Sequence, residues 1–464
     1  MSRIKGVLSY LKHYGFASTV NLVYEKLFSE KKRFSPKKQR RVPPLPREYN
    51  KKEIAEAEVK GEKRILYTVH YFYPERSGGT ERFTLNMAKE AKKRGNIPLV
   101  LVLDANLSEG KYTHRLGNMM YRYYEYDGIR CIGIRHKKAP GGLYYKNVIL
   151  DDGDMRAFAD YIINEEKIDL VHSTYPQPFA SFLDEGMALG VPYTVTCTDF
   201  AMLCRYATMV DSGGDFCPGA MRGDRCRSVC ANPLCRDFEK RCVSAEKILM
   251  GATYVTAPSA FVARILCEEF RGLKVAVIPH GISDSFAVSY RKRSKIRRFL
   301  YAGTLSYLKG VHLLVKAFSR LECQDAELVI CGDGEEGYKR SLMRGADSRI
   351  RFIGSVQKEK MPEIYSSADC VIVPSMWYET YNFVAREAAI TGAFLIVSDI
   401  GALPEALQSG GISFRAGDED SLYEAMKRAL EINPSDIQKS EWQSLDDEGD
   451  CYERIYNFSI KQKE

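Results

Sequence analysis

Three charged side chains are spaced in a way that suits a ligand carrying both hydroxyls and phosphate. Glu379 and Glu387 are separated by seven residues in SMWYETYNFVAREAAITG, the first in a predicted loop and the second in the first turns of a predicted helix. Both carboxylates can then face one edge of a cleft and accept hydrogen bonds from a polyol. Lys309 precedes a predicted helix in YAGTLSYLKG, and a fixed cation beside a helix start suits a diphosphate. Each residue alone equally fits an ordinary surface position.

A glycine pair adds another feature of this kind. Gly78 and Gly79, in SGGT, follow a predicted strand and open a predicted helix. Paired glycines let a backbone approach a ligand closely, and the start of a helix favours an anion. A simple glycine turn has the same sequence, so the pair carries weight only together with the other loops.

Cysteines gather in one stretch of the chain. Seven of the 13 cysteines lie between Cys197 and Cys242. In a reducing compartment, such a cluster more often binds metal or stays free than forms disulfides. Four thiolates suit tetrahedral zinc, and an iron–sulfur cluster uses the same ligands. Free or regulatory thiols and disulfides remain the alternatives.

Alternating strands and helices must position these residues. From Arg64 onward, apolar runs such as RILYTVHYF and IPLVLVLD alternate with helical segments, and a second set of the same kind begins near Arg297. This alternation predicts an α/β fold with doubly wound, parallel sheets, whose ligands bind beyond the carboxyl ends of the strands. We therefore expect two Rossmann-like domains facing a cleft.

The expected domain boundaries follow from the same pattern. A basic helical extension and linker occupy residues 1–50. The two domains are expected at 51–280, with the cysteine-rich insertion at 197–242, and at 281–436. The linker between them falls near 278–286. A C-terminal helix within 437–464 is expected to pack back across the domains.

The composition limits the class of protein. The chain has 464 residues, of which 45% are hydrophobic and 28% charged, as in globular proteins. It contains no apolar run long enough to span a membrane and no secretory pattern at its start, so we expect a cytoplasmic location. The net charge of +8 is partly local to EKKRFSPKKQRR. The basic residues 1–42 fit either peripheral contact with the inner face of a membrane or packing on the protein body.

The loops, taken in order, resemble those of a known family. The matching pieces are PERSGGTERFTLNMAKEAKKRG, YAGTLSYLKGVHLLVKAF, AELVICGDGEE, RFIGSVQKEKMPEIYSSADCVIVPS and ETYNFVAREAAITGAFLIVSDIGALPEAL. From about Arg64 to Asn457 the chain is similar to the glycosyltransferases of family 4, which have the GT-B fold. The resemblance implies transfer of a sugar, of the hexosyl type, from a nucleotide-diphosphate sugar to an acceptor hydroxyl, with retention of configuration and no catalytic cofactor. We expect a glycan or lipid-linked acceptor, in cell-envelope or exported polysaccharide biosynthesis.

The resemblance also implies roles for single residues. Glu387 is expected to hold the ribose hydroxyls of the donor, and Glu379 the hydroxyls of its sugar. Lys309 is expected to neutralise charge on the leaving diphosphate. The other implied donor contacts are Gly78 and Gly79 from the first domain and the backbone of Asn382, Phe383 and Val384 from the second.

Two positions depart from the family pattern. Thr304 stands in the donor-binding motif that ends at Lys309, where the family usually has an arginine, so one of two phosphate cations is missing. Thr198 stands where relatives usually have a histidine near the acceptor, while Asp199 remains to orient the acceptor or to act as a base. The candidate replacements for the missing arginine are Arg386, Arg205 and Lys358.

These departures keep other functions open. A non-catalytic scaffold or sugar-nucleotide-binding subunit is the second hypothesis. A zinc-finger-like nucleic-acid module ranks last, because the cysteine segment lacks finger spacing and interleaved aromatics. We therefore expect no nucleic-acid partner.

The resemblance narrows the set of cysteines. Relatives with a cysteine in this loop and a later cysteine group match best at Cys204, Cys217, Cys226 and Cys230. Cys235 and Cys242 are the competitors. The match implies a structural metal site beside the acceptor pocket, with zinc ranked before an iron–sulfur cluster.

Three other motifs are interpreted as structural. Asp152-Gly153-Asp154 mimics a metal-binding Asp-x-Asp sequence, but it precedes a helix and predicts an N-cap. Gly332-Asp333-Gly334 lacks the third glycine of a dinucleotide site and predicts a turn. His172, at the end of a predicted strand, is expected to have a structural role.

Overall fold

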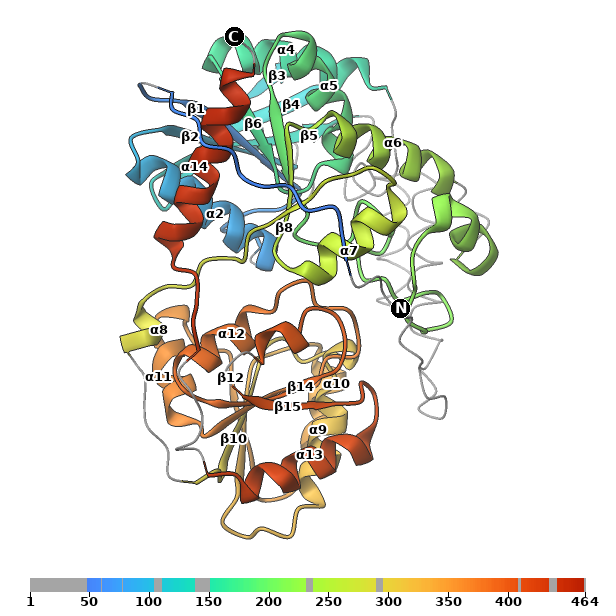
Figure 1. Cartoon of the computed structure of the whole chain (residues 1–464), viewed down its shortest axis with the longest axis vertical. Coiled ribbons are helices and arrows are strands. Elements are labelled where there is room, and N and C mark those ends of the chain that lie inside the picture. The colour runs from blue at the N-terminus through green and yellow to red at the C-terminus, as the bar shows by residue number, and fades with distance from the viewer. Residues whose placement is uncertain are drawn as a thin grey trace.

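A computed structural model describes residues 48–59, 61–76, 78–103, 111–137, 151–230, 237–288, 295–407, 410–433 and 440–462. These residues form two α/β domains, one above the other in Figure 1. The predicted extension at 1–42 lies outside the described residues. Among the helices that are described, none combines the length and the apolar character needed to cross a membrane.

The first domain is built on a nine-stranded sheet with the order β3-β4-β5-β2-β1-β6-β7-β8-β9. Its strands are β1 (Arg64–Val69), β2 (Ile97–Leu103), β3 (His114–Leu116), β4 (Met119–Tyr126), β5 (Ile129–His136), β6 (Leu170–Ser173), β7 (Tyr193–Thr196), β8 (Tyr254–Ala257) and β9 (Ala276–Val277). Its helices are α2 (Gly79–Lys93), α4 (Gly153–Glu166), α5 (Ala180–Ala188), α6 (Phe238–Gly251), α7 (Ala260–Glu269) and α14 (Leu445–Lys461). The central strands are buried on both faces, as their β-branched and leucine-rich sequences require.

One edge of this sheet differs from the predicted parallel arrangement. Strands β3, β4 and β5 form an antiparallel meander, and only β5 joins the parallel part of the sheet, beside β2. The turn between β4 and β5 is Asp127-Gly128, with both residues at positive φ. This dipeptide is a strong hairpin signal, because such a turn needs two residues that tolerate the left-handed region.

The second domain has a six-stranded parallel sheet with the order β12-β11-β10-β13-β14-β15. Its strands are β10 (Arg298–Ala302), β11 (Glu327–Cys331), β12 (Ile350–Gly354), β13 (Cys370–Val373), β14 (Phe394–Ser398) and β15 (Gly411–Phe414). Its helices are α8 (Ser285–Val288), α9 (Val311–Ser319), α10 (Glu336–Arg344), α11 (Met361–Ser367), α12 (Phe383–Ile390) and α13 (Glu419–Glu431). Helices on both faces of the sheet give a Rossmann-like domain.

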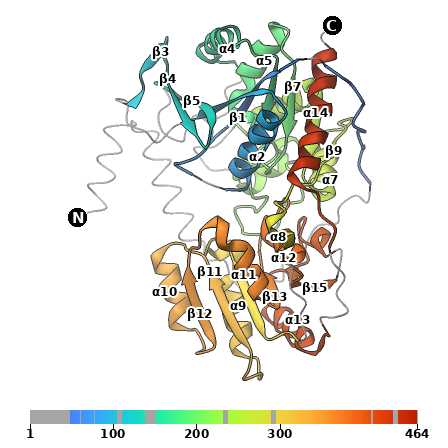
Figure 2. The same cartoon turned by 90° about the vertical axis from the view of Figure 1, so that its left-hand side faces the viewer.

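The chain passes between the domains twice. It leaves the first domain after β9 and returns before α14, which lies beside α2 in both views (Figures 1 and 2). The two passages are side by side, since the amide of Ile282 donates to the carbonyl of Gln443 at 2.9 Å. Glu448 on α14 accepts from the amide of Gly281 at 2.7 Å and contacts His280. The buried carboxylate thereby fixes the first passage to the returning helix.

Two of the motifs interpreted as structural, Asp152-Gly153-Asp154 and His172, have that role. The side chain of Asp152 accepts hydrogen bonds from the amides of Asp154 and Met155 and caps α4, which confirms the N-cap. His172 is fully buried, and its two ring nitrogens lie 2.7 Å from the hydroxyls of Tyr456 and Thr196. Burial lowers the pKa of His172 to about 3, so its ring stays neutral at physiological pH.

The close packing of the two connections at Gly281 leads to a prediction about stability. A Cβ at this position would lie 2.7 Å from the Cα of Leu445 and from the carbonyl oxygen of Ser444, which are backbone atoms that cannot rotate away. We expect Gly281→Ala to lower the free energy of unfolding by about 1–3 kcal/mol, the usual cost of overpacking. Urea unfolding measures the change. Gly345→Ala is the control, because a Cβ there meets no atom within 4 Å. Equal stability of the two variants would contradict the prediction.

Candidate active site

Glu379 is the centre of the site on the second domain. It lies in the loop between β13 and α12, and its Oε1 accepts hydrogen bonds from Lys309 Nζ, Ser375 Oγ and Trp377 Nε1, each at 2.7 Å. Burial favours a higher pKa for Glu379, but Lys309 and the hydrogen bonds outweigh burial and hold the pKa below its ordinary value. The carboxylate is therefore charged and fixed in orientation.

Lys309 owes its position to the glycine that follows it. Gly310 adopts φ of 70°, and a Cβ there would lie 1.8 Å from the carbonyl oxygen of Pro374. Only glycine allows this close approach of the Lys309 loop to the end of β13. The amide of Met376 donates to the carbonyl of Leu308 at 2.7 Å, which joins the lysine loop to the Glu379 loop.

The start of α12 directly follows the Glu379 loop in the chain. Asn382 is its N-cap, with φ of 67°, and its side chain accepts from the amide of Ala385 at 2.9 Å. The amides of Phe383 and Val384 belong to the first turn of α12. A first turn directs its N–H groups and the positive end of the helix dipole toward an anion.

Glu387, one turn further along α12, is paired with the other domain. Its carboxylate forms an ion pair with Arg82 of α2 at 2.5 Å, and the Arg82 guanidinium lies over the Phe383 ring, 4.2 Å from its centroid. Burial raises the pKa of Glu387, while Arg82, a hydrogen bond from Tyr365 and the charge of Lys358 oppose the rise. This ion pair links the two domains at this point.

Gly78 and Gly79 lie at the start of α2, one turn or less from Arg82. Gly78 is the N-cap with φ of −156°, an extended conformation open to any residue. A Cβ at Gly79 would meet no protein atom within 4 Å, and one at Gly78 would meet only the flexible end of Glu81. Packing within the protein therefore does not require this pair of glycines.

Asp199 and Thr198 follow β7 and reach the same region from the first domain. The hydroxyls of Thr198 and Thr80 are 2.7 Å apart, and the carbonyl of Thr198 accepts from Thr380 Oγ1 at 2.8 Å. Thr380 directly follows Glu379. The pKa of Asp199 is raised to about 7, first by burial and also by the charge of Glu81, against a hydrogen bond from the amide of Ala201.

Thr304 lies at the end of β10 and is exposed. The three residues predicted to replace an arginine at this position have different surroundings. Arg386 stacks over Tyr381 at 4.7 Å, and Arg205 pairs with Asp237 in the cysteine segment. Lys358 has charge interactions with both Arg82 and Glu387.

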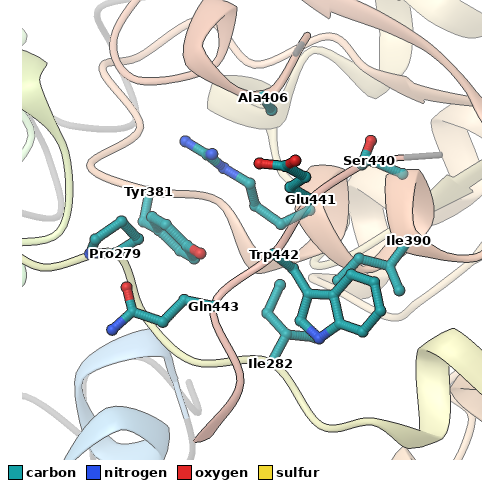
Figure 3. Close-up of a pocket in the computed structure, with 11 residues that line it drawn as sticks. Pro279, Ile282, Tyr381, Ile390, Ala406, Ser440, Glu441, Trp442 and Gln443 are labelled. Atoms are coloured by element: carbon teal, nitrogen blue, oxygen red, sulfur yellow. The ribbon is translucent and has the colours of Figure 1, made fainter. Parts of the chain in front are cut away.

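A pocket lies beside α12, and Figure 3 shows residues that line it. The passage residues Pro279 and Ile282, the returning segment 440–443 and one side of α12 line it. Arg386 is one of the residues that line this pocket. The pocket is therefore a feature of the double passage between the domains.

The structure thus brings most of the predicted site residues together and adds others. Lys309 and Glu379 are in contact, and the start of α12, with Glu387 one turn along it, follows Glu379 in the chain. Sequence reasoning missed Arg82, Ser375 and Trp377 as partners of the two glutamates. A signal existed for Arg82, which follows Gly79 by three positions and so lies on the first turn of the same helix.

The fold and the site define a GT-B protein, with two Rossmann-like domains and polar loops at the carboxyl ends of their strands. Sucrose-phosphate synthase from Thermosynechococcus elongatus has the same fold, with a TM-score of 0.58 and 18% identity over 86% of this chain and 95% of that chain. The Anabaena protein HepE, in complex with UDP and glucose, has a TM-score of 0.53 and 15% identity over 87% of this chain and 98% of that chain.

Two family models identify the family to which the chain belongs. The model for glycosyltransferase family 4 matches residues 77–286, and the model for glycosyl transferases group 1 matches residues 296–431. The chain belongs to the family 4 glycosyltransferases. An uncharacterized glycosyltransferase of Methanocaldococcus jannaschii is 30% identical over 204 residues, which cover 39% of this chain and 52% of that protein. The chain spans about half the length of the curated relatives it matches.

The raised pKa of Asp199 makes a prediction about stability. Because the folded protein raises this pKa from 3.8 to about 7, folding favours the protonated carboxyl. The wild type should therefore lose free energy of unfolding relative to Asp199→Asn as the pH rises from about 4 to about 7, and the difference should level off above that range. Urea midpoints of both proteins across the range measure it. A difference that is constant with pH, or that changes in favour of the wild type, would contradict the prediction.

Proposed function

We propose that the protein transfers a sugar from a nucleotide-diphosphate sugar to an acceptor hydroxyl, with retention of anomeric configuration. The observation that carries the proposal is a pair of buried carboxylates, Glu379 and Glu387, each held by a cation on either side of the start of α12. Buried carboxylates accept hydrogen bonds from sugar hydroxyls, and a helix start with a lysine nearby suits a diphosphate. Membership of the family supports the same assignment.

The donor is proposed to lie along the start of α12. Glu387 would hold its ribose hydroxyls, and Glu379 would hold the hydroxyls of its sugar. The diphosphate would lie against the amides of Phe383 and Val384, near Lys309. The bare backbone at Gly79 supports this placement, since the glycine leaves room that the packing of the protein does not use.

The proposed reaction breaks the bond between the anomeric carbon and the phosphate oxygen. Positive charge develops on the sugar and negative charge on the leaving diphosphate. Lys309 and the start of α12 stabilise the leaving group because they are already oriented before the bond breaks. The acceptor hydroxyl attacks from the side of the leaving group, which keeps the configuration, and its proton passes to the departing phosphate oxygen. Asp199 is proposed to orient the acceptor.

Arg82 is proposed to supply the cation that Thr304 does not. Its guanidinium is already at the donor region, and its Nε is buried without a hydrogen-bond partner among the described residues. When ribose hydroxyls bind Glu387, they compete with Arg82 for the carboxylate. The released guanidinium can then pair with a phosphate oxygen, a geometry that arginine suits well.

The acceptor is proposed to be a glycan or a lipid-linked glycan of cell-envelope or exported polysaccharide synthesis. Peripheral contact of the basic residues 1–42 with an anionic membrane surface would bring the first domain to such an acceptor. This part of the proposal depends on the sequence pattern of a segment outside the described residues.

A sugar-nucleotide-binding subunit without catalysis is the second candidate. Two observations favour it: Thr304 presents no charge at its position, and Thr198 is hydrogen-bonded within the protein to Thr80. Both candidates predict binding of a nucleotide sugar, so turnover separates them.

The proposal is tested by incubating the protein with a panel of nucleotide sugars and measuring the release of nucleoside diphosphate. We expect release with one donor, by slow hydrolysis alone and faster with an acceptor glycan. NMR of the product should show the anomeric configuration of the donor. Binding of a donor with no turnover under any condition would support the non-catalytic subunit. An inverted product would contradict retention.

Lys309→Ala is expected to lower kcat by about 100-fold or more, the usual loss when a preorganised group at a developing charge is removed. The change in KM should be smaller, because Lys309 acts mainly on the leaving group. Lys316→Ala is the matched control, since Lys316 is exposed on α9, the helix that follows Lys309. Similar kinetics for both variants would remove Lys309 from the proposed reaction.

Arg82→Ala is expected to weaken binding of the nucleoside diphosphate by about 10-fold, through the loss of a charged hydrogen bond to phosphate. Calorimetry measures the affinity. Arg82→Lys should recover part of it, and Lys92→Ala, an exposed change on the same helix, should leave it unaltered. If Arg82 only blocks Glu387, Arg82→Ala will bind more tightly, and that result would overturn the assignment of Arg82 as a phosphate cation.

A further inference from the structure

Tyr378 belongs to the second domain by its place in the chain, but its ring packs among aromatic side chains of the first. It directly precedes Glu379 in the loop between β13 and α12, and it is 4% exposed. The ring centroids of Phe216 and Phe261 each lie 5.1 Å from that of Tyr378, and the centroid of Phe200 lies 6.4 Å from it. Aromatic rings at these spacings attract one another beyond simple burial. We call Phe200, Phe216 and Phe261 the aromatic socket.

The aromatic socket is part of the apolar core of the first domain. Phe200 and Phe216 belong to the cysteine segment that connects β7 to α6, and Phe261 lies in the first turn of α7. All three rings are buried, and the same core cluster includes Tyr378. Figure 1 shows α7 at the edge of the first domain that faces α12. The core of the first domain therefore supplies a fixed surface for the loop that carries Glu379.

The rings of the socket are hydrocarbon, and their contacts with Tyr378 require no metal. The metal site that the family resemblance implies at Cys204, Cys217, Cys226 and Cys230 stays a prediction, since no three of the described thiols lie within 4.8 Å of one another. The cysteines that the structure describes form no disulfide, and the competing ligand Cys235 lies outside the described residues.

Thr380, on the other side of Glu379, is also bonded to the first domain. Its Oγ1 donates a hydrogen bond to the carbonyl of Thr198 at 2.8 Å, and its carbonyl accepts one from Ser259 Oγ at 2.7 Å. Thr198 follows β7, and Ser259 is the N-cap of α7. Both neighbours of Glu379 in the chain are therefore attached to the first domain, one by its ring and one by two hydrogen bonds.

The backbone of Glu379 itself is held by the second domain. The amide of Ala402 donates to the carbonyl of Glu379 at 2.8 Å. Gly401 adopts φ of 64°, and a Cβ there would lie 2.6 Å from both the amide nitrogen and the carbonyl oxygen of Glu379. Only glycine allows this approach. Three consecutive residues are thus held by the first, the second and again the first domain, so the place of Glu379 depends on both.

The carboxylate of Glu379 has one oxygen left for a ligand. The donors Lys309, Ser375 and Trp377 all meet Oε1, and Oε2 receives no hydrogen bond from the described residues. The strength of a hydrogen bond falls steeply as its distance and angle depart from the optimum. A displacement of about 1 Å in a positioned group costs about 100-fold in rate in well-studied enzymes. Small shifts of the backbone at Glu379 therefore matter for any sugar hydroxyl bound at Oε2.

We propose that Tyr378 is a positioning residue for the sugar of the donor. Its ring in the aromatic socket, together with the hydrogen bonds of Thr380, sets the backbone of Glu379 so that Oε2 meets particular hydroxyls. The first domain thereby takes part in selecting the sugar, although the carboxylate that contacts it belongs to the second. The identity of the ligand rests on the proposed function, whereas the positioning of Glu379 is testable without a ligand.

Tryptophan fluorescence tests the positioning in the absence of a ligand. The chain has two tryptophans, and Trp377 donates to the Glu379 carboxylate at 2.7 Å. The full chain with Trp442→Phe therefore has a single reporter beside Glu379. In this background we expect Tyr378→Ala to shift the emission to longer wavelength, because a loosened loop exposes the half-buried indole to water. Tyr378→Phe keeps the ring and should keep the emission.

Two further variants complete the fluorescence experiment. Thr380→Val removes the hydroxyl that donates to Thr198 at nearly constant volume, and should shift the emission in the same direction by less. It also stands in for Tyr378→Ala if circular dichroism shows that the latter does not fold. Tyr423→Ala is the control, because Tyr423 lies on α13 and packs on Arg320. Unchanged emission in Thr380→Val and in folded Tyr378→Ala, or an equal shift in Tyr423→Ala, would overturn the positioning.

Selectivity between donors tests the role in sugar recognition. The probes are two donors that share a nucleotide and differ in the configuration of one sugar hydroxyl, such as UDP-glucose and UDP-galactose. We expect Tyr378→Ala to reduce the ratio of their kcat/KM values by about 10-fold, since a hydroxyl-binding site discriminates through well-placed hydrogen bonds. Tyr378→Phe should restore the ratio. The affinity for nucleoside diphosphate alone should stay unchanged, because its proposed contacts do not use Glu379.

The outcomes separate this inference from the proposed function. If Tyr378→Ala slows both donors equally and also weakens binding of nucleoside diphosphate, Tyr378 has only a structural role and the inference is wrong. If no donor is turned over by the wild type, the transferase function fails and the role in sugar selection fails with it. The emission of Trp377 still decides in that case whether the aromatic socket positions Glu379.

Discussion

A carboxylate removed from water must be met by a cation or by hydrogen-bond donors, and this constraint governs the centre of the molecule. Glu379 is buried and receives a lysine, a serine and a tryptophan on one oxygen. Glu387 is buried and is met by an arginine from the opposite domain. The loops around them are arranged to supply these partners. Gly310 allows the lysine loop to approach, and Asn382 takes up a left-handed conformation to start α12.

The two carboxylates differ in whether their cation comes from the same domain or from the other one. Lys309 and Glu379 belong to the same domain, so their contact fixes the geometry of one binding surface. Arg82 and Glu387 belong to different domains, so their contact also links α2 to α12. The Glu379 loop extends into the first domain as well, through Tyr378 and Thr380. The site and the interface between the domains are therefore built from the same residues.

The sequence was sufficient for the fold class and for much of the site, because both depend on local patterns. Apolar runs and helix periods predicted the two α/β domains, and the segments after the strands held Lys309 and Glu379 in loops and Glu387 at the start of a helix. The antiparallel edge of the first sheet was missed, although Asp127-Gly128 carried a hairpin signal. The partners of the carboxylates were missed for a different reason. Arg82 and Glu387 are over 300 positions apart, and no local pattern encodes a contact that the packing of two domains creates.

The double passage between the domains also limits how they can move. One extended connection lets two bodies rotate about several axes, because a single chain twists and bends with little cost. Here two connections lie side by side, joined between Ile282 and Gln443. Twisting one body against the other would stretch one connection and compress its neighbour. A rotation about an axis that runs through both connections changes the length of neither connection. The two connections therefore favour one direction of opening between the surfaces that hold Arg82 and Glu387.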